Sequence, residues 1–505
     1  MTSSGTNSTD PADPSSPADP RDPAGPRGGG DGGRTALESV SAAWELLLPA
    51  AAAPVRGRGR ALQSALREAV RSGRLVPGTR LPSSRELAAD LGVSRGLVTE
   101  AYEQLTAESY LRSGRGAGTW VSGSARAAAG NARDLAPRAR DTVVDFRPGT
   151  PDLSLFPRSA WAAAHRSVLG RLPHSALGYP DPRGLPELRT ALAALLTRRR
   201  GVVAAPERLL VVSGVAQATT LLGFVLHGRG TRTVGVEDPG SPEHAALFAS
   251  AGLGTARLPL DDEGLAVAPL VRSGVRALVT TPAHQFPTGI AYSAARRSRL
   301  LDWARQTDGV IMEDDYDGDF RYDRAPVGAL QGLDPEHVAY TGSVSKSLAP
   351  GLRLGWLIAP ASMTDELVAR KRTMDLGNPA VDQAVLAEFI TGGGYDRQLR
   401  RCQRAYRERR DVLASALSEH FPGTEVSGIA AGLHIIARLP ARYGPEAAFT
   451  ARAAASGIAL RLLSDCGTAR PRDRCVRLVL GYAHLAPAEI VRGVRRLAEA
   501  GRGSA

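Results

Sequence analysis

The sequence predicts two folded domains of different kinds: an N-terminal winged helix-turn-helix that is mainly α, and a larger α/β domain on a mostly parallel sheet. Two short helical segments joined by a glycine turn and followed by a glycine-rich hairpin predict the first domain. Apolar β runs that alternate with helical stretches predict the second. A small, polar, arginine-bearing stretch between them has the composition of a linker.

Changes in composition set the predicted boundaries. Residues 1–54 form an N-terminal tail, whose first part is rich in Pro, Asp, Ser and Gly and buries too little apolar surface to fold. Residues 55–122 form the winged helix, 123–142 the linker, and 143–505 the large domain. Within the winged helix, apolar residues at four-residue spacing predict a first helix beginning near Arg60.

Overall composition narrows the class of protein. The formal net charge of +12 favours an anionic partner, although the bias is mostly arginine, because only Lys346 and Lys371 among 63 basic residues are lysines. The three cysteines lack metal-ligand spacing and suggest a reducing compartment. No apolar run approaches the roughly 18 residues that a membrane helix needs. We therefore expect a cytoplasmic protein with no metal site and no membrane contact.

Capping residues mark the helix-turn-helix. Ser83 or Ser84 can cap a helix that ends at the Gly92 turn, and Ser94 can cap a second helix that starts at Arg95. The amino end of such a second helix can enter the major groove of DNA. Residues 55–121 carry 11 arginines against 6 acidic residues, a balance of +5 that suits a polyanion.

Residues 58–121 resemble the winged helix of the GntR family over their whole length. The resemblance implies that Arg85 and Arg95 contact DNA, that Ser94 contacts a phosphate, and that the wing near Gly116 approaches the minor groove. Thr99 stands where the family has an arginine one turn after Arg95. The full set of predicted DNA-binding residues is Ser83, Ser84, Arg85, Ser94, Arg95, Thr99 and Gly116.

Lys346 is the candidate for covalent attachment of a cofactor. It lies in the string YTGSVSKSLAPGLRLGW, after an apolar strand and in a serine-rich turn. A Schiff base requires an amine that can lose its proton, which arginine cannot do at neutral pH. Ser343, Ser345 and Arg353 can supply hydroxyl and bidentate donors to a phosphate. The pattern resembles fold-type-I enzymes that bind pyridoxal 5′-phosphate (PLP), of the aspartate aminotransferase kind.

Further strings in this sequence resemble aminotransferase motifs and occur in the same order along the chain as in those enzymes. LGYPDPRGLPELR resembles the N-terminal aminotransferase motif, which implies that Tyr179 reaches the phosphate in a partner subunit. VVSGVAQA ends a strand and opens a helix, where the N–H groups of Val215 and Ala216 can hold the phosphate. VIMEDDYD ends a strand in carboxylates. By resemblance Asp314 holds the proton of the pyridine nitrogen, and Tyr316 donates to the ring hydroxyl.

The loop that faces the ring departs from the family. In TPAHQFPTG, Phe286 replaces the asparagine of the aminotransferase loop, so that His284 or Gln285 would serve the ring. In EDPGSPEH, Ser241 stands where the MocR subfamily of GntR regulators, which this order of motifs resembles, often has a tyrosine that stacks on PLP, and Glu243 stands where its GABA-responsive type has an arginine. The parts that orient a substrate are therefore altered.

The substrate-carboxylate arginine of aminotransferases is also missing from its usual place, which Val479 occupies. Arg461, in the strand-like run GIALRLL, is one substitute. Arg477 is the other, because strand alternation places it on the face of Val479. Both are predicted effector-binding residues.

Winged helix, linker and PLP domain follow one another as in the MocR subfamily of GntR regulators, which includes the GABA-responsive GabR type. The resemblance covers roughly residues 58–497. It implies a homodimeric regulator that binds double-stranded DNA at its own or a neighbouring promoter and senses PLP or a small amino compound. Two alternatives are an active aminotransferase with a DNA-binding extension and a regulator that works without PLP. The altered substrate-orienting parts predict little or no transaminase turnover.

Overall fold

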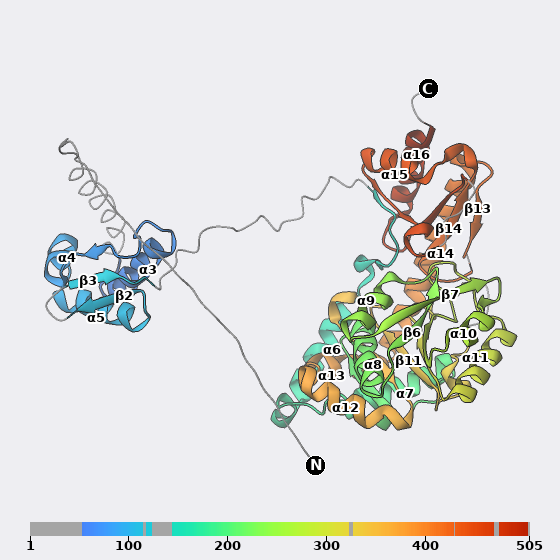
Figure 1. Cartoon of the computed structure of the whole chain (residues 1–505), viewed down its shortest axis with the longest axis horizontal. Helices are drawn as coiled ribbons and strands as arrows, with labels where there is room; N and C mark the ends of the chain where they lie inside the picture. The colour runs from blue at the N-terminus through green and yellow to red at the C-terminus, as the bar shows by residue number, and fades with distance from the viewer. Residues whose placement is uncertain are drawn as a thin grey trace, which may run out of the picture. The chain divides into compact units, whose positions relative to one another are not determined.

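The computed structural model describes residues 53–114, 118–123, 144–322, 327–428, 430–468 and 474–502. The chain divides into two compact units, 1–138 and 139–505 (Figure 1). The predicted tail and linker lie almost wholly outside the described residues, so that their boundaries stay predictions.

The N-terminal unit is a winged helix. Its elements are α3 (Arg58–Arg71), β1 (Arg80–Leu81), α4 (Ser84–Leu91), α5 (Arg95–Ala107), β2 (Leu111–Gly114) and β3 (Gly118–Val121). The strands form one antiparallel sheet in the order β1-β3-β2, and β2 and β3 are the hairpin of the wing. The predicted stripe of Leu62, Leu66 and Val70 is buried against Val98 and Leu105 of α5.

Local hydrogen bonds fix the helix-turn-helix. Ser83, not Ser84, caps α4: its Oγ accepts from the N–H of Glu86 at 3.3 Å, and the Glu86 carboxylate accepts from the N–H of Ser83 at 2.9 Å. Gly92 ends α4 in the left-handed region, with φ of 61°. Ser94 then caps α5 by accepting from the N–H of Leu97 at 3.3 Å.

The large unit is built on an eight-stranded sheet in the order β5-β12-β11-β10-β9-β6-β7-β8. The strands are β5 (Leu209–Val212), β6 (Thr233–Asp238), β7 (Gly254–Asp261), β8 (Gly264–Leu265), β9 (Ala277–Thr280), β10 (Val310–Asp314), β11 (Val338–Ser343) and β12 (Gly355–Ile358). The pairs from β11 to β7 are parallel, whereas β12 and β8 run antiparallel to their neighbours. The predicted mostly parallel sheet is confirmed.

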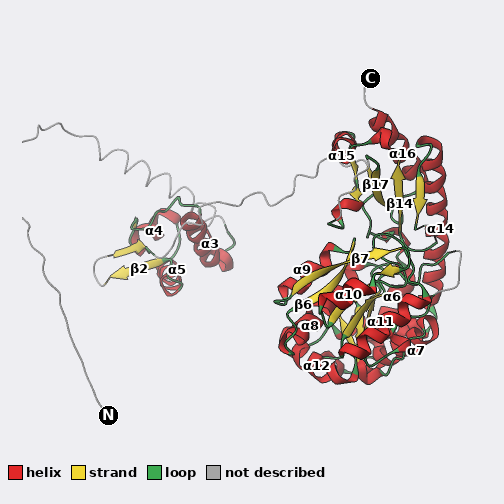
Figure 2. Cartoon of the chain, turned by 45° about the vertical axis from the view of Figure 1, so that its right-hand side comes forward, coloured by secondary structure: helices red, strands yellow, loops and turns green. Residues whose placement is uncertain are grey.

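Helices cover both faces of this sheet (Figure 2). They are α6 (Arg158–Arg171), α7 (Pro186–Arg200), α8 (Val215–Gly228), α9 (Pro242–Ser250), α10 (Val267–Ser273), α11 (Ala294–Thr307), α12 (Ala361–Asp375) and α13 (Ala380–Thr391). Leu222 of α8 packs with Met312 on one face, and Leu300 of α11 packs with Ile311 on the other. Burial on both faces explains why the central strands are continuous apolar runs.

A C-terminal subdomain follows in the same unit. It holds an antiparallel sheet in the order β13-β14-β17-β16, made of β13 (Glu425–Ser427), β14 (His434–Leu439), β16 (Arg461–Leu462) and β17 (Val476–Gly481). Its helices are α14 (Gly394–His420), α15 (Glu446–Ala455) and α16 (Pro487–Arg502), and the short strands β4 (Val144–Asp145) and β15 (Ile458–Ala459) pair in parallel.

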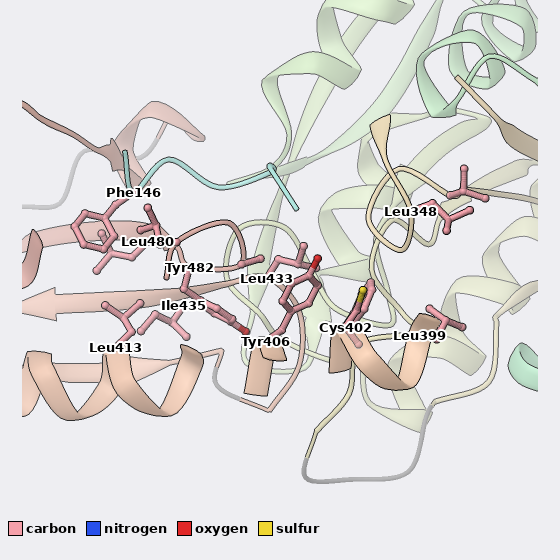
Figure 3. Close-up of a cluster of buried hydrophobic side chains, with 14 of the residues drawn as sticks. Phe146, Leu348, Leu399, Cys402, Tyr406, Leu413, Leu433, Ile435, Leu480 and Tyr482 are labelled. Carbon is pink, nitrogen blue, oxygen red and sulfur yellow. The ribbon is translucent and has the colours of Figure 1, made fainter. Parts of the chain in front are cut away.

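One face of α14 joins the subdomain to the turn that carries Lys346. Leu413 of α14 lies with Ile435 and Leu480, whereas Leu399, near its start, lies with Leu348 (Figure 3). The buried carbonyl of Ser347 also accepts from the Gln398 amide at 3.2 Å. The contacts of Leu399 with Leu348 and of Gln398 with Ser347 both come from α14, so that the position of the Lys346 turn depends on the packing of this helix.

Among the described helices, none is long and apolar enough to cross a membrane. Within the same residues, no three His, Cys, Asp or Glu side chains gather in a way that could hold a metal ion.

The core beneath α14 predicts a graded response to substitution. Leu413→Ala removes a side chain that is 0% exposed, and it should lower the free energy of unfolding of the large unit by about 2–5 kcal/mol. Urea unfolding of the full chain, followed by circular dichroism, measures the change. Glu408→Ala, at an exposed position of the same helix, should stay within about 0.5 kcal/mol of the parent. Equal effects of the two substitutions would contradict this account of the core.

Candidate functional site: a cavity at the carboxyl ends of the parallel strands

A cavity of about 300 Å³ lies where the large sheet meets the C-terminal subdomain. Six of the predicted site residues line it, namely Val215, Ala216, Asp314, Tyr316, Lys346 and Arg461. Gly149, Glu243, His244, Phe286 and His434 are among the others. Strands β10 and β11 are parallel, so that Asp314 and the turn after Ser343 leave the sheet at the same edge.

The Lys346 side chain is half-buried, and its Nζ donates to the carbonyl of Gly149. Burial lowers the pKa of this amine below its ordinary value, and the negative charges of Asp317, Asp314 and Glu243 oppose that effect. The lowered pKa favours the neutral amine, the form that attacks an aldehyde. Ser343 lines a small adjoining space beside Lys346, and its Oγ accepts from the N–H of Ser345 at 3.3 Å.

The amino end of α8 faces the same cavity. Its first N–H groups, at Val215 and Ala216, have no acceptor inside the helix. Arg353 lies beside them: its guanidinium donates to the Ser213 carbonyl, and a Cβ added to Gly214 would lie 3.1 Å from it. Unpaired N–H groups, the helix dipole and a guanidinium together suit a phosphate.

Asp314 is buried with one oxygen engaged and the other open. Its Oδ2 lies 3.0 Å from Nε2 of His244, whereas no described residue hydrogen-bonds its buried Oδ1. Burial alone would lower the pKa of His244, but the hydrogen bond and the charge of Asp314 outweigh burial and raise it. The contact with His244 positions the carboxylate of Asp314, which lines the cavity and keeps Oδ1 for a group bound there. A buried carboxylate oxygen without a donor suits the protonated nitrogen of a pyridine ring.

Tyr316 is placed by the ring-facing loop. Its hydroxyl lies 3.0 Å from Nδ1 of His284, which also lies 2.9 Å from Asp317. Burial and the charge of Asp317 raise the pKa of Tyr316 well above its ordinary value, so that the hydroxyl stays protonated and can donate. His284 thus contacts Tyr316, and Phe286 lines the cavity instead of the family's asparagine.

Six predicted cofactor- or effector-binding residues are absent from the cavity lining. Ser343, Ser345 and Arg353 adjoin Lys346 or the amino end of α8, whereas Gln285, Tyr179 and Arg477 do not. Gln285 is 0% exposed, and its amide is engaged by the carbonyl of Pro239 at 3.0 Å and by Thr288 at 2.6 Å. Gln285 therefore connects its own loop to the residues at the end of β6. Tyr179 is 91% exposed, as a residue that reaches into a second subunit would be. Arg477 lies on β17 opposite Arg438, away from the cavity lining.

Of the two candidate effector arginines, the structure brings Arg461 to the cavity. It stands on β16 directly opposite Val479, the position at which aminotransferases carry their carboxylate-binding arginine. Strand β16, next to β17, therefore places the guanidinium of Arg461 in the cavity lining. Its Nη1 lies 3.9 Å from the Glu243 carboxylate of α9.

The predicted DNA-binding residues of the winged helix lie around the starts of α4 and α5. Arg85, Ser94 and Arg95 are exposed, whereas Ser84 and Thr99 are half-buried and line a hollow between the helices and the wing. The Thr99 hydroxyl donates to the Arg95 carbonyl at 3.0 Å. Gly116 lies outside the described residues.

His244 and His434 are site residues that the motifs did not predict. His244 stands in the string EDPGSPEH, four residues after Gly240, and its pairing with Asp314 joins positions 70 residues apart. A polar residue in the first turn of a helix that follows a parallel strand was the available signal. His434 had no such signal, because β14 belongs to a separate sheet.

Two family models match the chain. Aminotransferase class I and II matches residues 142–497, and the gntR family of bacterial regulatory proteins matches residues 59–121. Fold and site therefore define a class of protein in which a DNA-binding winged helix is fused to an aminotransferase-like domain that holds PLP.

Curated relatives share this architecture. The chain is 33% identical over 465 residues to the probable rhizopine catabolism regulatory protein MocR of Rhizobium meliloti, which covers 87% of this chain and 93% of that protein. It is 33% identical over 379 residues to the HTH-type pyridoxine biosynthesis transcriptional regulator PdxR of Corynebacterium glutamicum, with 74% and 82% covered. The chain belongs to the MocR subfamily of GntR transcription regulators, as its motifs predict.

Solved aminotransferases share the fold of the large unit. LysN, the alpha-aminoadipate aminotransferase of Thermus thermophilus, complexed with N-(5′-phosphopyridoxyl)-L-leucine, superimposes with a TM-score of 0.63 at 27% identity, over 75% of this chain and 96% of that chain. The multiple substrate aminotransferase of Thermococcus profundus gives 0.64 at 28%, over 74% and 94%. The predicted fold-type-I architecture and the PLP cofactor are confirmed.

His434 predicts a pH dependence of stability. Burial, together with the nearby charge of His284, lowers its pKa from 6.5 to about 4. The unfolded chain therefore binds a proton at His434 between these values and the folded chain does not, so that this contribution to stability is present above pH 6.5 and lost as pH falls towards 4. The stability difference between the parent and His434→Asn should shrink by about 3 kcal/mol from pH 7 to pH 4.

Urea unfolding at each pH measures that difference. His174→Asn, the same exchange at an exposed position, controls for the removal of an imidazole from the surface. A difference that stays constant over the range would show that the pKa of His434 is the same in the folded and the unfolded chain, which contradicts this account.

Proposed function

We propose that this regulator senses PLP, or a small amino compound that reacts with it, in the large-domain cavity and changes its affinity for promoter DNA accordingly. One observation carries the proposal: the cavity brings together the Lys346 amine, the open Oδ1 of Asp314 and the amino end of α8. These are the groups that an aldehyde, a pyridine nitrogen and a phosphate require.

Each residue has a distinct task in this proposal. PLP, when bound, supplies an aldehyde that combines with amines and a ring that withdraws electrons. Lys346 provides the amine, and its lowered pKa eases loss of the proton from Nζ. Asp314, held by His244, keeps a proton on the ring nitrogen, and Tyr316 donates to the ring hydroxyl. The phosphate is bound by the N–H groups of Val215 and Ala216 and by Ser343, Ser345 and Arg353.

The same proposal includes a homodimer in the cytoplasm. Tyr179 supports it: an exposed tyrosine within the aminotransferase motif has a task only if it enters a second subunit's site. Two winged helices would then contact paired half-sites on double-stranded DNA. Signalling requires that the ligand bind one arrangement of the dimer more tightly than another. We propose little or no transaminase turnover, because Phe286 and Ser241 replace substrate-orienting and ring-stacking groups.

Lys346 should carry the cofactor. Full-length protein given PLP should show a visible absorbance band, and borohydride reduction followed by peptide mapping should place the cofactor on the Lys346 peptide. Lys371, the only other lysine, is 0% exposed and bound to Asp375 at 2.7 Å and Asn378 at 2.7 Å, so that its peptide should stay unmodified. A Lys346→Ala protein that keeps the band would refute the assignment.

The winged helix should bind DNA through Arg85 and Arg95. Alanine at either position should weaken binding to the protein's own upstream region by about 1–3 kcal/mol and reduce the slope of affinity against salt by about one. Gel shifts over a range of salt concentrations, with and without PLP, provide the measurement. Arg74→Ala removes an exposed arginine in the turn after α3 and should change neither quantity. Equal losses in all three variants would assign the effect to net charge alone.

A further inference from the structure

We infer that the effector is a short diamino carboxylic acid, whose amino-acid head is bound by the charge pair of Glu243 and Arg461. The inference rests on the proposed function and names the class of ligand for the same cavity. It starts from two side chains of opposite charge that line the cavity together from different elements, α9 and β16.

The geometry of the pair leaves room for a ligand. Nη1 of Arg461 and Oε1 of Glu243 are 3.9 Å apart, at the outer limit of an ion pair. The two side chains are 29% and 64% exposed, so that their mutual attraction contributes only about 0–1 kcal/mol. A ligand that offers each of them a direct, charge-assisted hydrogen bond gains more than the pair loses.

Glu243 is held in position for this task. Its other oxygen, Oε2, accepts from the Ser241 hydroxyl at 2.8 Å, which orients the carboxylate. The same charge lies close enough to oppose the effect of burial on the pKa of Lys346. Glu243 and Lys346 therefore line the same cavity. A cation bound to the Glu243 carboxylate is near the cofactor.

The charges specify the ligand. A ligand that binds both side chains needs a carboxylate for Arg461 and, next to it, an ammonium group for Glu243. An α-amino acid carries these two groups on one carbon atom. A further primary amine is then needed to reach the cofactor carbon. Because about 300 Å³ must hold the cofactor and ligand together, a short chain such as 2,4-diaminobutyrate fits the class.

The covalent step balances without a co-reactant. With PLP bound, the free amine of the ligand would take the place of the Lys346 amine at the cofactor carbon: one carbon–nitrogen double bond forms while another breaks, and the two hydrogens that the incoming nitrogen gives up pass to the Lys346 nitrogen. The proton lost by the incoming ammonium goes to the released Lys346 amine. Nothing is oxidised or reduced.

Three probes test the class on the full-length, PLP-loaded protein. 2,4-Diaminobutyrate has all three groups, 4-aminobutyrate lacks the α-amine, and 1,3-diaminopropane lacks the carboxylate. Titration followed by the change in visible absorbance should give half-saturation by 2,4-diaminobutyrate at a concentration at least about tenfold lower than for either analogue, because each lost charge-assisted bond weakens binding by about that factor or more.

Variants assign the preference to residues. Glu243→Gln should reduce the preference over 4-aminobutyrate to within about twofold, and Arg461→Gln should do the same for the preference over 1,3-diaminopropane. Glu187→Gln is the matched control, since Pro186–Glu187 begins α7 as Pro242–Glu243 begins α9 but lies away from the cavity. It should keep both preferences.

The outcomes separate this inference from the proposed function. Equal half-saturation by 4-aminobutyrate, or a preference that survives Glu243→Gln, overturns the diamino-acid class. If the band forms and DNA binding depends on PLP, but no probe changes the absorbance, the effector class is wrong and PLP sensing stands. If no band forms at all, the proposed function itself fails.

Discussion

The parallel arrangement of β10 and β11 is the constraint on which the functional site depends. Parallel strands present their carboxyl ends at one edge of a sheet, so that Asp314 and the turn of Lys346 meet there although 32 positions separate them in the printed sequence. The amino end of α8 reaches the same edge, because β5 is antiparallel to β12, which is itself antiparallel to β11, so that β5 and β11 point the same way. One topological fact thus brings an amine, a carboxylate and the amino end of a helix into a single cavity.

Two buried carboxylates at this edge of the sheet, Asp314 and Asp315, differ in how far their oxygens are hydrogen-bonded. Asp315 is fully satisfied: Arg200 pairs with it at 2.6 Å and the Tyr340 hydroxyl donates to it at 2.6 Å. Asp314, its neighbour, points to the cavity and keeps an oxygen without a donor. A buried carboxylate oxygen without a hydrogen-bond donor destabilises a fold, so the open Oδ1 of Asp314, next to the fully satisfied Asp315, supports the proposal that a ligand bonds it.

Short motifs predicted the parts of the site that are local in sequence. Lys346, Asp314 and the α8 amino end each follow a strand, and a strand followed by a turn can be recognised from one short string. The pairing of His244 with Asp314 and the presence of Arg461 opposite Val479 depend on register between distant strands and helices, which no string records. For the same reason Gln285 looked equivalent to His284 in sequence, whereas in the fold its amide bonds Thr288 of its own loop and Pro239 after β6.

The cavity also joins two parts of the large unit. Lys346, Asp314 and Glu243 come from the eight-stranded sheet and its loops, whereas Arg461 and His434 come from the C-terminal sheet. A ligand that contacts both sheets stabilises the relative position of the sheets to which it binds more tightly. Only such a difference in affinity between two arrangements can shift the populations of conformations. The helix α14 packs its buried face against both the Lys346 turn and the C-terminal sheet, so that one packed core connects the two sides of the cavity (Figure 3). Under the proposed function, an effector bound beside the cofactor would contact both parts of the large unit, so that the protein would keep the geometry of an aminotransferase while its output is the occupancy of a promoter.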